Sequence, residues 1–247
     1  MARIPIGLQL WSVKDACKED LAGTLKAVAE MGYDGVESGK FIAAEAAEMK
    51  AILDDVGLKM CGTHVPMDTL RGDELSKTVE FYRTCECRHL IVPYMKHETR
   101  EDCERFAEEL SAVAETLRPL GMSTGYHLHY HDVAPRDGEW PWQTIFRAGG
   151  KGLIAQMDAG NCLGAGVDPT PLVREFPGQA VTVHLKDWSG PRSEPLVGEG
   201  NVQWAAFFDA CESVGGVTWY IVEQEKYPVP PLDSVRKCLE NLRAMGK

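Results

Sequence analysis

LAGTLKAVAEMG-YDGVE (residues 21–37) decides the fold, because it joins an amphipathic helix, a glycine and a short apolar strand in that order. A glycine just past a helix end supplies the left-handed residue that terminates the helix, so the junction has a physical cause. The same order recurs at 48–64, 108–131, 146–158 and 204–223. Further strand-like segments at 4–11, 89–94 and 181–187, and a last helix at 233–246, continue the alternation.

Eight strands that alternate with helices or helix-sized spacers predict a parallel sheet with right-handed crossovers. Eight such units in about 250 residues match the size of a closed α/β barrel, the (β/α)8 TIM barrel. We expect it to form a single domain over residues 1–247. An open, doubly wound sheet is disfavoured, because no glycine-rich phosphate loop follows the first strand and no edge strand is evident.

Composition narrows the classes of partner. The 247 residues are 44% hydrophobic and carry a net charge of −11, which repels nucleic acid and anionic membranes, so we expect neither as a partner. The 8 cysteines are scattered through expected helices and strands, which indicates a reducing compartment and no disulfide framework. The first residues lack the apolar segment of a signal peptide, and no apolar run approaches the ~20 residues of a membrane span. We therefore expect a cytoplasmic protein.

The last three strands end on side chains that can bind metal: LIAQMD on Asp158, VTVH on His184 and WYIVE on Glu223. The carboxyl ends of barrel strands meet at one face, so we expect the three side chains to lie together. Burying them is costly unless a partner compensates, and their oxygen and nitrogen atoms suit one divalent ion such as Mn²⁺, Mg²⁺, Co²⁺ or Zn²⁺. The structural alternatives are a turn cap for Asp158, a backbone contact for His184 and an ion pair for Glu223.

A fourth ligand is expected from the fifth strand, where His127, His129 and His131 alternate. In an extended strand all three would share one face. His127 lies deepest and is the expected metal ligand. His129 is the substitute, or orients the first histidine from behind. The structural alternative is a solvated, hydrogen-bonded rim.

Three more ionisable residues at expected strand ends are candidates for catalysis. Lys186 shares a face with His184 and could hold a substrate hydroxyl or an enolate oxygen, or else form a salt bridge with Asp187 or a strand-end carboxylate. Glu37 and His64 are expected across the barrel mouth from the metal, where they could transfer protons or bind substrate hydroxyls. The alternative is a structural pair in which Glu37 orients His64.

Together these strand ends resemble the xylose isomerase-like TIM-barrel superfamily, which includes sugar isomerases and epimerases, inosose dehydratases, hydroxypyruvate isomerases and endonuclease IV-type repair enzymes. The resemblance spans nearly the whole chain, and the HLKD, GEG and VEQE series is its most specific part. The matching segments are IGLQLWSV (6–13), MGYDGVE (31–37), CGTHVP (61–66), GYHLHYHD (125–132), MDAGNCLGAGVDP (157–169), VHLKDW (183–188), VGEGNVQW (197–204) and WYIVEQE (219–225).

The resemblance implies one divalent ion held by residues of strands five to eight, which here are His127, Asp158, His184 and Glu223. In the ketose epimerases the ligand on the fifth strand is a glutamate that also acts as a base. Here His127 stands at that position, and the Tyr-His-x-His pattern is more similar to the inosose dehydratase and uncharacterised sugar-isomerase branch.

These observations predict a metal-dependent isomerase or epimerase of a small sugar or polyhydroxy ketone, acting through an enediolate. The ion would chelate the carbonyl and a neighbouring hydroxyl, Glu223 or Glu37 would take the carbon-bound proton, and Lys186 would help to stabilise the enediolate. The nearest rival is a lyase similar to inosose dehydratase, with His64 or His129 as the acid that protonates the departing hydroxyl.

Two other classes are less favoured. An endonuclease IV-type enzyme needs three zinc ions and extra histidines, whereas this chain has Asn161 in the DAGN turn and no histidine pair before VGEGN. A non-catalytic sugar-binding protein would show no metal-dependent proton exchange. The expected partner is a small sugar or polyol, and a homo-oligomer is compatible with the sequence.

Overall fold

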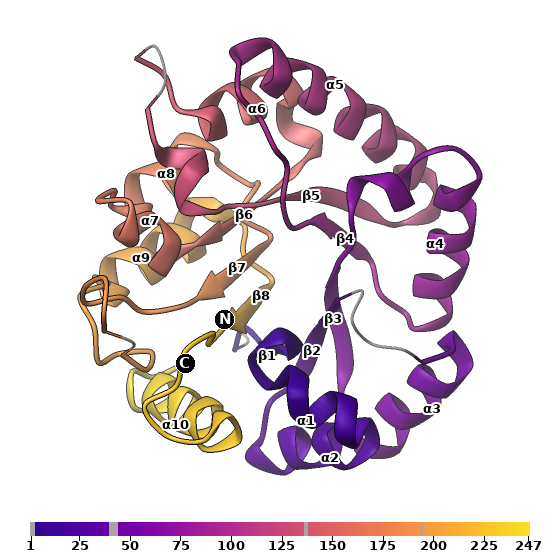
Figure 1. Cartoon of the computed structure of the whole chain (residues 1–247), viewed down its shortest axis with the longest axis vertical. Helices are drawn as coiled ribbons and strands as arrows, with labels where there is room; N and C mark the ends of the chain where they lie inside the picture. The colour runs from indigo at the N-terminus through magenta and orange to yellow at the C-terminus, as the bar shows by residue number, and fades with distance from the viewer. Residues whose placement is uncertain (1–2, 40–43, 136–137, 194) are drawn as a thin grey trace.

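The strands of the protein form one closed barrel (Figure 1), seen in a computed structural model that describes residues 3–39, 44–135, 138–193 and 195–247. Neighbouring strands pair in sequence order and in parallel, and β1 pairs with β8 to close the ring. The predicted TIM barrel is confirmed. Within the described residues the strands are β1 Ile6–Gln9, β2 Gly35–Gly39, β3 Lys59–His64, β4 His89–Val92, β5 Ser123–His127, β6 Ile154–Asp158, β7 Thr182–Leu185 and β8 Trp219–Val222.

Helices surround the barrel on its outside (Figure 1). Glycines end the helices before β2 and β3, as predicted: Gly32 and Gly57 follow α2 and α3 with φ of 95° and 75°. Two of the helix-sized spacers, after β3 and after β6, contain helices as well. The helices of the described ranges are α1 Lys14–Glu19, α2 Leu21–Met31, α3 Ala46–Val56, α4 Gly72–Thr84, α5 Arg100–Leu117, α6 Pro141–Gly149, α7 Ala159–Gly164, α8 Pro169–Glu175, α9 Trp204–Ala210 and α10 Pro231–Ala244.

The longest helix, α5, shows how the sequence dictates an element. Thr99 and Asp102 form a capping box that satisfies the first backbone N–H groups. From there, apolar side chains at helical spacing, among them Phe106, Leu110 and Leu117, are buried against the barrel. No helix in the described part of the chain combines the length and apolarity needed to cross a membrane.

The centre of the barrel is polar. Gln9, Glu37, Gln156 and Thr182 point inward from β1, β2, β6 and β7, and each is at most 1% exposed. Barrel interiors are usually filled by branched apolar side chains, so buried polar groups here must satisfy one another. They lie directly below the predicted site.

Two strand ends differ from the predicted ones. β5 stops at His127, and residues Tyr130–Val133 turn away, because Asp132 accepts hydrogen bonds from the His129 backbone N–H and from His97 Nε2. The prediction that three alternating histidines share one strand face is therefore wrong. Conversely, β2 runs on to Gly39, so Glu37 is not a strand-end residue but lies deeper in the barrel.

Candidate metal centre

The four predicted metal ligands come together at the carboxyl end of the barrel. His127 and Asp158 end β5 and β6, His184 is the penultimate residue of β7, and Glu223 follows β8. One nitrogen or oxygen atom from each residue lies within 4.8 Å of the others, and all four side chains are buried. We call these four residues the ligand cluster.

Asp158 supplies the feature that best fits a bound cation. Its Oδ1 accepts a hydrogen bond of 2.7 Å from the backbone N–H of Asn161 and so caps α7, as the structural alternative supposed. Its Oδ2 is buried and accepts no hydrogen bond from any described residue, although it lies 3.4 Å from Lys186 Nζ. Burial raises the pKa of this carboxyl to about 6. A buried carboxylate oxygen left in this way is costly, and a cation would compensate that cost.

Lys186 borders the cluster and contacts three carboxylates. Its Nζ lies 3.0 Å from Glu223 Oε2 and 2.6 Å from Glu225 Oε2, in addition to the contact with Asp158. Burial opposes its charge, but Asp158 and Glu223 outweigh burial and raise its pKa well above the ordinary value. Lys186 is thus a fixed ammonium group that pairs with strand-end carboxylates. Asp187, the other predicted partner, instead accepts hydrogen bonds from the loop after β7.

His184 lies between two carboxylates. Its Nε2 is 2.6 Å from Glu37 Oε2, and its Nδ1 is 3.2 Å from Glu223 Oε2. Burial alone would lower its pKa, but the charges of Glu37 and Glu223 raise the pKa of His184 to about 10. Burial would raise the pKa of Glu223, but Lys186 and His184 together hold it well below its ordinary value.

Glu37 lies beneath His184, not across the barrel mouth as its strand-end assignment implied. Its side chain is fully buried, and it accepts hydrogen bonds from Gln9 Nε2 at 2.7 Å and from Gln156 Nε2 at 2.8 Å. His64 Nε2 lies 3.2 Å from Glu37 Oε2, so the two residues do form a pair. Burial opposes ionisation of Glu37, but His64 and His184 outweigh it and lower the pKa.

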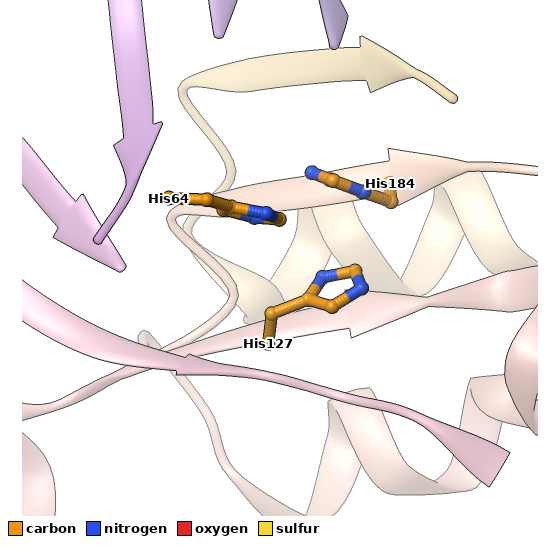
Figure 2. Close-up of side chains that lie close together, drawn as sticks. All are labelled: His64, His127 and His184. Atoms are coloured by element: carbon orange, nitrogen blue, oxygen red, sulfur yellow. The ribbon is translucent and has the colours of Figure 1, made fainter. Parts of the chain in front are cut away.

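His64, His127 and His184 lie close together (Figure 2), and His64 and His184 both contact Glu37. The His127 ring centroid is 4.9 Å from that of His64 and 4.4 Å from that of His184. Burial and the nearby His184 charge lower the pKa of His127 well below its ordinary value, so this ring is neutral. A neutral imidazole is the form that binds a metal.

Gln156 is a member of this site that the sequence analysis missed. Its amide oxygen lies 2.8 Å from His64 Nε2 and 3.0 Å from His127 Nδ1. One signal could have revealed it: a glutamine within the apolar strand IAQMD, two residues before Asp158 and therefore on the same face. Such a buried amide is unfavourable unless it is hydrogen-bonded.

The other two histidines of the fifth segment, His129 and His131, lie in different surroundings. The His129 ring packs edge-on against His127 with centroids 4.8 Å apart, and its buried Nδ1 has no hydrogen-bond partner among the residues that the structure covers. His131 instead stacks on His97 at 5.1 Å and faces Asp132, outside the ligand cluster. His129 therefore remains a neighbour of the site, and His131 does not.

A cavity of about 450 Å³ opens beside Lys186. Its walls combine aromatic rings with hydrogen-bonding groups, as is common in small-molecule sites, and include Tyr130, Asn161, Trp188 and Glu225. A larger cavity of about 980 Å³ lies around Lys59, Arg88 and Trp219 and contains none of the clustered ligands.

Asp187 holds the loop on one side of the cavity beside Lys186. It is 6% exposed, and it gathers the VGEGN segment by accepting hydrogen bonds of 2.8–3.1 Å. The donors are the backbone N–H groups of Trp188, Gly198, Gly200 and Val202 and the indole Nε1 of Trp204. The segment singled out by resemblance is thus anchored by the residue next to Lys186.

Several proteins are similar to this chain. The MocC rhizopine catabolism protein of Rhizobium meliloti is 24% identical over 263 residues, which cover 90% of this chain and 80% of that protein. An inosose dehydratase of Geobacillus kaustophilus is 25% identical, covering 83% of this chain and 80% of that enzyme.

Solved structures share the fold at low identity. A sugar phosphate isomerase/epimerase of Parabacteroides distasonis superposes with a TM-score of 0.85 at 18% identity, covering 99% of this chain and 97% of that one. The IolI protein, solved with a zinc atom, superposes at 0.75 with 11% identity, covering 97% of each chain. The family described as xylose isomerase-like TIM barrel matches residues 25–245. This protein therefore belongs to the xylose isomerase-like TIM-barrel family.

Proposed function

We propose that this protein is a divalent-metal-dependent isomerase or epimerase of a small sugar or polyhydroxy ketone. The observation that carries the proposal is the buried ligand cluster, in which Asp158 Oδ2 accepts no hydrogen bond from the described part of the chain. Two imidazoles and two carboxylates suit Mn²⁺, Co²⁺ or Zn²⁺ better than Mg²⁺, which prefers oxygen ligands. The IolI protein, which shares the fold, was solved with a zinc atom, and this supports a bound metal ion.

The ion, when bound, would polarise a carbonyl and a neighbouring hydroxyl and so acidify the carbon-bound proton between them. Glu223, whose pKa is held well below its ordinary value, is ionised at neutral pH and is the base we assign. Lys186 lines the cavity and can donate to a substrate hydroxyl or to a developing oxyanion. The His64 side chain keeps 13% of its surface exposed, so it can relay a proton or bind a hydroxyl.

Glu37 is the less suitable of the two candidate bases. It is fully buried, and its carboxylate already accepts hydrogen bonds from Gln9, Gln156 and His184. A base must reach the proton that it removes, either directly or through one water. We therefore assign Glu37 the task of orienting His184 and His64.

The test compares wild type with Glu223→Gln. We expect about one Mn²⁺, Co²⁺ or Zn²⁺ per wild-type chain by elemental analysis, and metal-dependent uptake of deuterium from D₂O into a ketose by NMR. Glu223→Gln should lose both. Glu225→Gln, an exposed neighbour outside the ligand cluster, is the matched control and should retain the ion. A fully active Glu223→Gln enzyme would refute the assignment.

The rival lyase reaction is favoured by the similarity to an inosose dehydratase. Product analysis separates the two: a dehydratase product has lost one water, whereas an isomerase or epimerase product keeps its atoms and gains deuterium. His64 and His129 are the acids available to a departing hydroxyl. If no ketose or inosose exchanges protons with any of the four metals, the protein is a binding protein instead.

A further inference from the structure

Gln156 makes four hydrogen bonds at the centre of the barrel, where it is fully buried. Its Nε2 donates to Glu37 Oε1 at 2.8 Å and to Thr182 Oγ1 at 2.9 Å. Its Oε1 faces His64 Nε2 at 2.8 Å and His127 Nδ1 at 3.0 Å. A primary amide has two N–H donors and two acceptor lone pairs, so this residue uses its whole capacity.

Glu37 fixes which way round the Gln156 amide lies. A carboxylate only accepts hydrogen bonds, so the atom 2.8 Å from Glu37 Oε1 must be the NH₂ group. The reversed amide would place oxygen against oxygen at that distance and would leave two buried interactions unmade. Glu37 cannot turn away either, because Gln9 and His184 hold its other oxygen.

The orientation of the amide then decides where the protons of two histidines lie. The Gln156 oxygen can only accept, so His127 carries its hydrogen on Nδ1 and His64 carries one on Nε2. The lone pair of neutral His127 is therefore on Nε2. A metal-ligating histidine is usually held in just this manner, by a hydrogen bond from its other nitrogen.

The hydrogen bonds of His184 likewise show which carboxylate each of its ring nitrogens faces. Its Nε2 faces Glu37 Oε2 at 2.6 Å, and its Nδ1 faces the carboxylate of Glu223. Both ligand histidines thus direct one nitrogen toward the central glutamate and glutamine and leave the other for the ligand cluster. The deeper nitrogens are committed to hydrogen bonds and are not open to a second ion.

We propose that Gln156 is a positioning residue that selects the Nδ1–H tautomer of His127 and so presents Nε2 to the ion. The ion itself rests on the proposed function, but the tautomer does not. Gln156→Met removes all four hydrogen bonds at similar volume. Thr182→Val removes only the partner that contacts no histidine, and it is the matched control.

The first readout is the tautomer of His127 in ion-free protein, measured from the ¹⁵N shifts of its ring and assigned with His127→Gln. We expect the Nδ1–H form in wild type and Thr182→Val, and its loss as the single form in Gln156→Met. The Nε2–H form in the wild-type protein would overturn the inference, whether or not Gln156→Met folds.

The second readout is the affinity for Mn²⁺ by calorimetry. We expect a loss of about 10- to 100-fold in Gln156→Met and a change within about threefold in Thr182→Val. A folded Gln156→Met protein with wild-type tautomer and wild-type affinity would overturn the inference. Wild-type protein that binds no Mn²⁺, Co²⁺ or Zn²⁺ would instead refute the proposed function, and the tautomer result would still stand.

Discussion

At the scale of the residue, the two oxygens of Asp158 serve folding and the ligand cluster respectively. One caps α7, and the other accepts no hydrogen bond within the ranges that the structure describes. An asparagine side chain would keep the capping oxygen, so for Asp158→Asn we expect a change in ion-free stability within about 1 kcal/mol. Affinity for Mn²⁺ should fall by about 100-fold or more, as calorimetry can measure. Asp168→Asn, which alters an equivalent cap on α8 outside the cluster, should keep the ion.

The charge on His184 makes ion binding depend on pH. Its pKa of about 10 means that both ring nitrogens are protonated at neutral pH. Because a cation must displace the Nδ1 proton, we expect release of about one proton per ion, and an affinity that rises about tenfold per pH unit from about pH 7 and levels off above about pH 10. Below about pH 6, protonation of Asp158 adds to the competition.

Calorimetry in buffers of different ionisation enthalpy counts the released proton. The control is His129→Gln, because His129 lies beside the cluster but is not one of its four residues. An affinity that does not change between about pH 7 and 9 would contradict the assigned charge of His184.

The sequence predicted which residues meet, but not their depth. His127, Asp158, His184 and Glu223 follow from the rule that barrel strands converge at their carboxyl ends. The depth of Glu37 depends on a register shift between β2 and β3 at Val36/Glu37, which no local pattern encodes. The role of Gln156 could not be predicted for a related reason, since its four hydrogen-bond partners come from four other strands.

At the scale of the element, the loop after β7 depends on one carboxylate. Asp187 accepts hydrogen bonds at both oxygens from donors that lie up to 17 residues further along the chain. An amide group cannot accept at its NH₂ end, so Asp187→Asn leaves buried donors unpaired. We expect a loss of about 3 kcal/mol or more in the free energy of unfolding, with faster proteolysis between 188 and 204.

The matched control for that loop is Asp209→Asn. Asp209 pairs with Arg174 at the surface, where its side chain is 67% exposed. We expect the free energy of unfolding to change by less than about 0.5 kcal/mol. Equal effects of the two variants in urea unfolding would argue against the anchoring role of Asp187.

The turn between α4 and β4 contains the one non-glycine residue with positive φ among the described residues, Glu86 at 57°. Side chains disfavour this conformation by about 1–2 kcal/mol, and glycine's extra freedom when unfolded offsets part of that. We expect Glu86→Gly to stabilise the protein by about 0.5 kcal/mol in urea unfolding. Gly57→Ala, at φ 75° with open space around the added carbon, is the converse and should destabilise it.

Element boundaries show the same division between local and long-range causes. The glycines that end α2 and α3 act within their own turns, so their positions could be predicted. The end of β5 could not, because it depends on Asp132 and its partner His97, 35 residues away.

At the scale of the whole molecule, the barrel and its helices bury all 8 cysteines of the sequence, and none of these described residues forms a disulfide. Burial also raises the thiol pKa at seven of these positions, to about 11 at Cys85, so reactive thiolate is scarce there. The seven are Cys17, Cys61, Cys85, Cys87, Cys162, Cys211 and Cys238. We expect a thiol reagent such as Ellman's to modify none of the 8 rapidly in native protein and all 8 in denaturant. A reductant should leave the melting temperature unchanged.

The pairing of β1 with β8 has a consequence for biosynthesis. The first strand acquires its second neighbour only when residues 219–222 have left the ribosome, so an unpaired sheet edge persists through most of translation. Contacts of such long sequence separation form late and leave the nascent chain open to aggregation. A newly made copy of this protein should therefore depend on chaperone holding until its last strand has emerged.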